Sequence, residues 1–186
     1  MKKNFNFDVS GLFLVIVDVQ ERLVKAMPEK VVEQIYKNIN LFTLASKVYN
    51  IPVIVTEQYP KGLGETASNI TKNLKDFKKV VKTTFSCCYS KLFNKEIEEL
   101  KRKTAILVGM ETHVCIFQTT LGLLENGYKV FIPNDAVCSR AKKNWENGIK
   151  MLSESGALIS NTESMIFQML KDANSSEFKQ LSPFLK

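Results

Sequence analysis

Short apolar runs rich in β-branched residues alternate with amphipathic stretches along almost the whole chain, and this alternation most limits its fold. The clearest run is Leu12–Val17, whose unbroken hydrophobicity is typical of a strand buried on both faces of a parallel sheet. Similar strands are predicted over 51–55, 79–82, 105–108, 128–132 and 157–159. Because parallel neighbours need a crossover, the order predicts an α/β fold with three layers (α/β/α) and a six-stranded, mostly parallel sheet.

Between these runs, apolar residues recur at helical spacing. The predicted helices cover ranges that share this periodicity: 31–49, 91–101, 112–126, 141–152, 163–171 and 176–185. A loop is expected over 56–66, because Pro60, Gly62 and Gly64 interrupt any regular pattern there. The polar segment 68–77 is compatible with either a short helix or a loop.

Composition narrows the class of protein. A chain of 186 residues is long enough for one core, and we expect a single domain over 1–186. No apolar run approaches the length of a membrane span, and the polar N-terminus lacks a secretory signal pattern, so a cytoplasmic protein is expected. The net charge of +7 leaves a nucleic-acid surface open, but no recognition motif accompanies it. A solvated lysine-rich face, with no nucleic-acid or membrane partner, is therefore predicted.

Three chemically complementary side chains stand where predicted strands end. Asp18 follows the first strand, Lys82 ends the third, and Cys115 lies just after the fourth. Open parallel sheets build their sites at the carboxyl ends of strands. A carboxylate can accept a thiol proton, an ammonium can stabilise the thiolate, and the thiolate can attack a carbonyl carbon. Taken singly, the aspartate also fits a turn residue and the lysine a solvated end of a lysine run.

Cys115 is expected in the first turn of a helix that begins near Thr112. The threonine hydroxyl is a candidate N-cap, and the free amides and dipole of such a turn favour a thiolate. The alternative is a small buried hydrophobe, which is what free cysteines usually are. In the sheet order 3-2-1-4-5-6, Lys82 would start roughly 10 Å from Asp18, so its side chain must point inward over the first strand.

Four segments together resemble the motif blocks of the isochorismatase-like cysteine hydrolases. The first three are Leu14–Gln20 (LVIVDVQ), Val81–Ser86 (VKTTFS) and Gly109–Cys115 (GMETHVC). The loop Thr56–Gly64 (TEQYPKGLG) resembles the branch called isochorismatase domain-containing proteins. The resemblance extends from about residue 12 to the C-terminus, with the blocks in family order.

This resemblance implies a catalytic triad of Asp18, Lys82 and Cys115. It also implies a cis peptide bond just before Glu111, and an oxyanion hole made by the backbone N–H groups of Glu111 and Cys115. The implied reaction is hydrolysis of an amide-like C–N bond in a small molecule, through a thioester on the cysteine. The family commonly forms dimers or larger homo-oligomers, so a homo-oligomer is expected.

Departures from the family pattern concern metals. Nicotinamidases of the family carry an Asp-x-His metal motif after the second strand, whereas this chain has Thr56–Gln58 without a histidine there. His113, the only histidine, lies inside the nucleophile block. We therefore expect no metal and no cofactor. Isochorismatases proper, which cleave a vinyl ether, lack the cysteine that this chain has at position 115.

Four further residues are assigned to substrate binding: Gln20, Tyr59, Phe85 and His113. For each, structural packing or a structural hydrogen bond is the alternative, and Gln20 is also a candidate partner of Asp18 or its loop. Two other functions stay open. One is a catalytically silent interaction protein on a hydrolase fold. The other is a thiol sensor using Cys115 or the adjacent pair Cys87 and Cys88.

Overall fold

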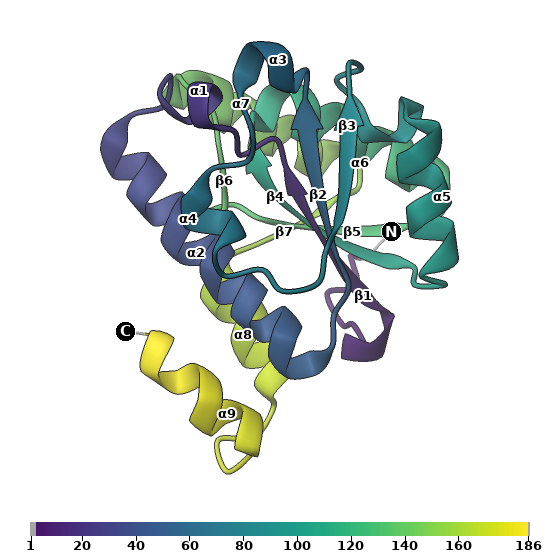
Figure 1. Cartoon of the computed structure of the whole chain (residues 1–186). Coiled ribbons are helices and arrows are strands. Elements are labelled where there is room, and N and C mark those ends of the chain that lie inside the picture. The colour runs from purple at the N-terminus through teal and green to yellow at the C-terminus, as the bar shows by residue number, and fades with distance from the viewer. Residues whose placement is uncertain (1–2, 186) are drawn as a thin grey trace.

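A twisted parallel sheet forms the centre of the molecule in the computed structural model, which describes residues 3–185 (Figure 1). Its strands run in the order β3-β2-β1-β4-β5-β7, and the short β6 pairs with β4. All of these pairings are parallel. The strands are β1 (Leu12–Val17), β2 (Val53–Gln58), β3 (Lys78–Lys82), β4 (Thr104–Met110), β5 (Lys129–Pro133), β6 (Val137–Cys138) and β7 (Leu158–Ser160).

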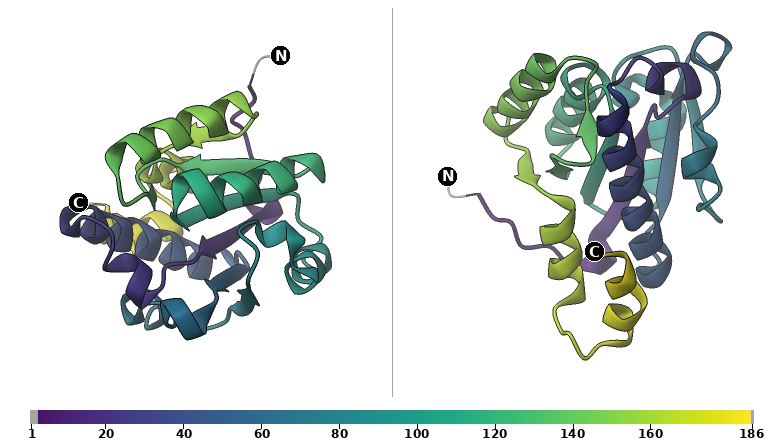
Figure 2. Two further views of the ribbon diagram at one scale, coloured as in Figure 1. Left: turned by 90° about the horizontal axis from the view of Figure 1, so that it is seen from above. Right: turned by 90° about the vertical axis from the view of Figure 1, so that its left-hand side faces the viewer.

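Helices cover both faces of the sheet, as the view from above in Figure 2 shows. The α-helices are α1 (Glu21–Val24), α2 (Glu29–Tyr49), α3 (Pro60–Leu63), α4 (Ser68–Thr71), α5 (Lys91–Glu99), α6 (Phe117–Glu125), α7 (Lys142–Glu154), α8 (Thr162–Leu170) and α9 (Ser176–Leu181). A π-helical turn, η3 (Thr112–Ile116), precedes α6, and three short 3₁₀ turns are η1 (Val9–Gly11), η2 (Cys87–Tyr89) and η4 (Ser182–Phe184). No helix among residues 3–185 is long and apolar enough to cross a bilayer.

Alternating side chains of β1 feed two separate cores. Leu14 and its same-face neighbours pack against α2 and α8, whereas Phe13 and its neighbours pack against α5, α6 and α7. All six residues of β1 are completely buried. Since burying an aliphatic side chain contributes about 1.5–3 kcal/mol, this strand anchors both layers. Its carboxyl end, where Asp18 follows, is thereby held in place.

The predicted fold class and sheet order are confirmed, with one strand added. Each of the six predicted strands is present, and β7 takes the sixth place in the order. β6 was not predicted, because two residues carry no periodic signal. β2 begins later than expected and continues through the polar Thr56 to Gln58, where pairing with β3 overrides the loop-like composition. Likewise α6 begins at Phe117 rather than near Thr112, because the π-helical turn comes first.

A close approach of two backbones requires glycine at position 109. Gly109 pairs with Val17 across β4 and β1 and has a φ of +115°. A Cβ atom added there would lie 2.1 Å from the carbonyl oxygen of Val17. Because Asp18 follows Val17 directly, this contact also sets where the aspartate stands.

We predict that Gly109→Ala destabilises the protein by about 3 kcal/mol or more, since it combines positive-φ strain with a backbone clash. Urea unfolding followed by circular dichroism measures this change. Gly11→Ala is the matched control, because a Cβ at Gly11 meets nothing within 4 Å. Its effect should stay within about 0.5 kcal/mol. Equal midpoints for the two variants would contradict the prediction.

Candidate active site

Asp18 lies at the carboxyl end of β1, completely buried, with a φ of 52°. Both oxygens of its carboxylate are hydrogen-bonded. Oδ1 accepts from the hydroxyl of Thr56 at 2.6 Å, and Oδ2 accepts from Nζ of Lys82 at 2.6 Å. The Asp18 N–H also donates to the Thr56 carbonyl at 3.2 Å. The carboxylate is thus fixed by side chains from β2, which is adjacent to β1, and from β3, which is one strand further.

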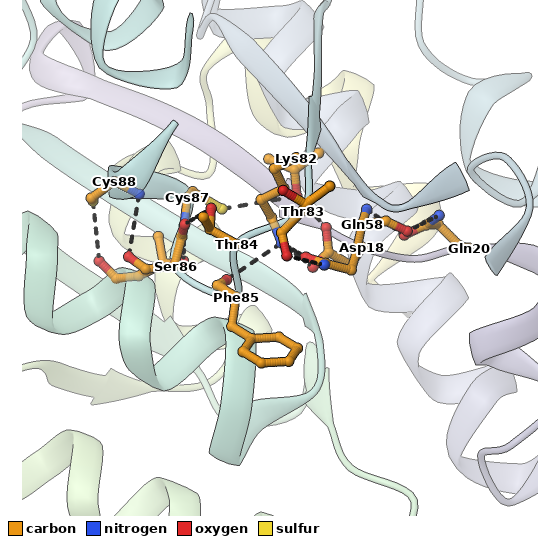
Figure 3. A network of polar contacts seen from close by, with 12 residues as sticks. Asp18, Gln20, Gln58, Lys82, Thr83, Thr84, Phe85, Ser86, Cys87 and Cys88 are labelled. Atoms are coloured by element: carbon orange, nitrogen blue, oxygen red, sulfur yellow. Dashed lines mark hydrogen bonds and ion pairs between the residues drawn. The ribbon is translucent and has the colours of Figure 1, made fainter. Parts of the chain in front are cut away.

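Lys82 lies at the end of β3, two strands away from β1. Its side chain points inward, as the predicted contact requires, and reaches the Asp18 carboxylate. Its side chain is fully buried, and Nζ donates to three acceptors: Asp18 Oδ2, Gln58 Oε1 at 2.8 Å and the Phe85 carbonyl at 3.4 Å (Figure 3). An ammonium has three N–H donors, so all are used. Burial is the largest single influence and lowers the pKa of Lys82, but the charge and hydrogen bond of Asp18, together with the nearby Cys87 and Cys115, outweigh it, so the pKa lies above its ordinary value.

Gln58 belongs to this network, and its role was not predicted. Its amide Nε2 donates to the Thr83 carbonyl at 2.7 Å, while its Oε1 accepts from Lys82. Gln20 in turn holds the Gln58 backbone, accepting from its N–H at 2.7 Å and donating to its carbonyl at 3.0 Å. Figure 3 shows these side chains in a row. The one available signal was a polar triplet, 56–58, directly after an apolar strand.

The assignment of Gln20 to substrate binding stays a prediction, and the contacts found for its side chain are structural. Gln20 is fully buried. Besides its bonds to the Gln58 backbone, its amide Nε2 donates to the Gly64 carbonyl at 2.6 Å. Gln20 therefore stabilises the backbone segments that carry Gln58 and Gly64. Its backbone N–H donates to the Asp18 carbonyl at 2.8 Å, so Gln20 also contacts Asp18, as the alternative expected.

Cys115 lies in the π-helical turn η3, not in the first turn of an α-helix. The turn is closed by the Ile116 N–H, which donates to the Glu111 carbonyl at 3.2 Å. Thr112 is not the N-cap: Glu111 takes that position, and the buried Thr112 hydroxyl has no hydrogen-bond partner in the described structure. The peptide bond between Met110 and Glu111 is cis, at the position that the resemblance implied.

The environment of Cys115 favours the thiol, contrary to the expected effect of a helix N-terminus. Burial raises the pKa of Cys115 well above its ordinary value, and the negative charge of Asp18 and its hydrogen bond with the thiol raise it further. The charge of Lys82 acts in the opposite direction but does not outweigh them. The resting pair is therefore a thiol beside a carboxylate, which is suited to proton transfer onto the carboxylate.

Glu111 and His113 turn toward β6 and the residues after it. Oε1 of Glu111 pairs with Arg140 at 3.0 Å, and Oε2 lies 3.6 Å from Nδ1 of His113. That histidine nitrogen is 3.0 Å from the Ser139 hydroxyl. His113 is therefore engaged in a structural hydrogen bond, which was the alternative considered for it. These contacts connect the turn that carries Cys115 to the neighbouring strand.

Tyr59 and Phe85 flank the Lys82 end of the network at the surface. Each is 54% exposed, and the Tyr59 N–H donates to the Lys82 carbonyl at 2.9 Å. The ring of Phe85 extends away from the hydrogen-bonded groups (Figure 3). Surface hollows of about 440, 610 and 410 Å³ lie elsewhere on the described chain, and none of these three is lined by the Asp18, Lys82 or Cys115 side chains.

The other cysteines are free thiols, of which Cys87 and Cys138 are buried. Burial raises the pKa of Cys87 to about 11 and that of Cys88 to about 12. Their sulfurs contact different groups: Thr56 for Cys87 and the Thr119 carbonyl for Cys88. A thiol held in its neutral form reacts slowly with oxidants, so these contacts favour a packing role for both.

The sequence and the fold resemble those of known proteins. The model of the family described as isochorismatase domain matches residues 13–164. The secreted isochorismatase effector Isc1 of Phytophthora sojae is 40% identical over 151 residues, 79% of this chain and 72% of that relative. Isochorismatase domain-containing protein 2 of Xenopus laevis is 35% identical over 146 residues, 76% of this chain and 68% of the relative.

Among solved structures, the MAR1 ribonuclease of Caenorhabditis elegans superimposes with a TM-score of 0.89 at 31% identity. The match covers 96% of this chain and 91% of that one. Because the family model spans most of the chain, the chain belongs to the isochorismatase family of hydrolases, and it is similar to isochorismatase domain-containing proteins.

Proposed function

We propose that this protein is a cysteine hydrolase that cleaves an amide-like C–N bond of a small molecule. The observation that carries the proposal is the buried Asp18 carboxylate, which is bonded to the Lys82 ammonium and interacts with the Cys115 thiol. A buried carboxylate beside a nucleophile and a fixed cation is an arrangement that acid–base and nucleophilic catalysis both need.

In the first half of the reaction, Asp18 takes the thiol proton as the sulfur of Cys115 attacks the carbonyl carbon. The S–C bond forms, and the carbonyl electron pair moves to oxygen. The backbone N–H groups of Glu111 and Cys115 stabilise this oxyanion; losing one such donor typically costs about a hundredfold or more in rate. Asp18 then gives its proton to the departing nitrogen, the C–N bond breaks, and a thioester remains on Cys115.

In the second half, water replaces the amine. Asp18 accepts a proton from this water, and the oxygen attacks the thioester carbonyl. The C–S bond breaks, the acid leaves, and the proton returns to the Cys115 sulfur. Lys82 stays protonated throughout, since its raised pKa and three acceptors hold it as an ammonium. Its role is to orient Asp18 and to balance the charge that passes across the site.

We also propose that the protein works as a homo-oligomer in a reducing, cytoplasmic compartment. Apolar side chains between 45% and 77% exposed gather along and after β3: Val81, Phe85, Tyr89 and Leu92. Exposed apolar patches commonly mark interfaces, and a second copy lying here would enclose the open side of the site. The four free thiols suit a reducing compartment.

The competing function is a binding protein without turnover. Replacing Cys115 with alanine separates the two, because only a cysteine hydrolase loses its activity. Across a panel of small primary and secondary amides, we expect Cys115→Ala to lower the rate of at least one hydrolysis by about a thousandfold or more. Cys88→Ala, which removes a thiol outside the triad, should leave that rate unchanged. Equal rates for wild type and Cys115→Ala on every amide would contradict the hydrolase.

A solved neighbour is named a ribonuclease, so a short single-stranded RNA belongs in the same panel. Cleavage of the RNA that depends on Cys115, with every amide left intact, would reject C–N cleavage and assign phosphodiesters as the substrate class.

Asp18→Asn should have opposite effects on turnover and on thiol ionisation. Turnover should fall by about a hundredfold or more, because the base is lost. The pKa of Cys115 should fall, because the charge of Asp18 raises it in the wild type while Lys82 lowers it. Alkylation by iodoacetamide, followed by intact mass against pH, should therefore reach its half-maximal rate at a lower pH in the variant. An unchanged or higher midpoint would contradict this role for Asp18.

Charge placed on the exposed apolar patch should separate the proposed oligomer. We expect Tyr89→Asp with Leu92→Asp to give monomers where the wild type gives a larger species, since an interface core tolerates unpaired charge poorly. Size-exclusion chromatography with light scattering measures the mass. Circular dichroism checks that the variant is folded. A wild type that is already monomeric would reject the oligomer.

A further inference from the structure

A lysine-lined hollow of about 610 Å³ lies on the outer face of α2, between the loop that follows α4 and the C-terminal turn η4. A second hollow of about 410 Å³ adjoins it and shares Thr43, Lys47, Asn73 and Lys75. Figure 1 shows α2 crossing between α4 and α9, away from the strand ends that carry Asp18. This volume is in the range, about 300–1,000 Å³, of sites for small molecules.

Three of the lysines that line the hollow take no part in the ion pairs described for the chain. Among the ion pairs of residues 3–185, none involves Lys47, Lys72 or Lys75. No aspartate or glutamate lines the larger hollow, and Asp76 is the acidic residue that lines the smaller one. Ammonium groups gathered around a concave surface raise the local concentration of anions. The hollow is thus suited to a ligand with several negative charges.

Asparagine side chains hold the two walls of the hollow together. Nδ2 of Asn40, on α2, donates to the Asn69 carbonyl at 3.1 Å, and Nδ2 of Asn73 donates to Oδ1 of Asn40 at 2.9 Å. Nζ of Lys72 lies 3.5 Å from Oδ1 of Asn69. These bonds fix the loop that carries Lys72 and Lys75 against the helix that carries Lys47. Fixing these backbone segments in advance lowers the conformational entropy that is lost when their lysines bind an anion.

An aromatic ring completes the lining. Phe184, in η4, lines the same hollow and is 56% exposed. Nucleobases stack on exposed aromatic rings next to lysines that contact phosphates, and each base has a face that can stack. An inorganic anion would use the lysines and leave the ring without a role.

We propose that this hollow binds a nucleoside polyphosphate, with its phosphates on Lys47, Lys72 and Lys75 and its base on Phe184. The site is separate from the triad and does not depend on the proposed hydrolase. Lysine contacts phosphate oxygens as a point charge, so the interaction weakens as salt rises.

Calorimetric titration of the full chain with ATP, without divalent cations and at low salt, tests the lysines. Lys47→Gln with Lys75→Gln should weaken ATP binding by about tenfold or more, because two phosphate contacts are lost. Lys91→Gln with Lys143→Gln is the matched control: it removes the same net charge from α5 and α7, in the opposite helical layer. An equal loss in the control, or no binding of ATP by the wild type, would overturn the site.

Phe184→Leu tests the base, since it removes the ring and keeps an apolar side chain. It should weaken ATP binding several-fold and leave the binding of inorganic tripolyphosphate unchanged. Wild-type protein should bind ATP more tightly than tripolyphosphate, and adenosine only weakly. Equal affinities for ATP and tripolyphosphate, with no effect of Phe184→Leu, would reject a nucleotide site.

Discussion

The buried ion pair between Asp18 and Lys82 is the interaction on which the rest of this structure depends. The two charged groups are 2.6 Å apart, and neither side chain is exposed. Losing one partner of such a pair typically costs about 3–5 kcal/mol, because the other charge stays buried and uncompensated. β2 lies between β1 and β3 and supplies one further partner to each group, Thr56 to the carboxylate and Gln58 to the ammonium. Sheet order and site chemistry therefore constrain each other.

This pair also determines when the nucleophile ionises in the proposed reaction. Asp18 opposes a thiolate on Cys115 by its charge. In the proposed reaction, the same group accepts the thiol proton. The sulfur therefore gains nucleophilicity as its proton moves, while negative charge develops on the substrate oxygen. A permanently ionised thiolate would react with many electrophiles. A thiol that ionises only beside a bound carbonyl confines its reactivity to the substrate.

Features that depend on strand ends and strand order could be predicted from the sequence, whereas features that depend on side-chain contacts could not. The apolar runs indicated a parallel sheet, and the family order then placed Asp18, Lys82 and Cys115 at one edge. The π-helical turn before α6 was missed, since its residues fit an α-helix equally well by periodicity. Gln58 was missed because its role depends on Lys82, which is distant in sequence. The direction of the Cys115 pKa depends on burial and on Asp18, which local position does not reveal.

For lysines that are close together in the sequence, the sequence likewise did not show which would be paired with carboxylates. The segment 72–82 carries lysines at 72, 75, 78 and 79, which indicated a solvated face, and it ends at Lys82, which was assigned to the triad. In the structure, Lys78 and Lys79 pair with Glu96 and Glu57, while Lys82 is buried against Asp18. The first two lysines of the segment have no carboxylate partner among the described ion pairs and line a hollow instead. Partners brought by other elements decide which of these charges are neutralised, so the net charge of a segment does not show where a free anion can bind.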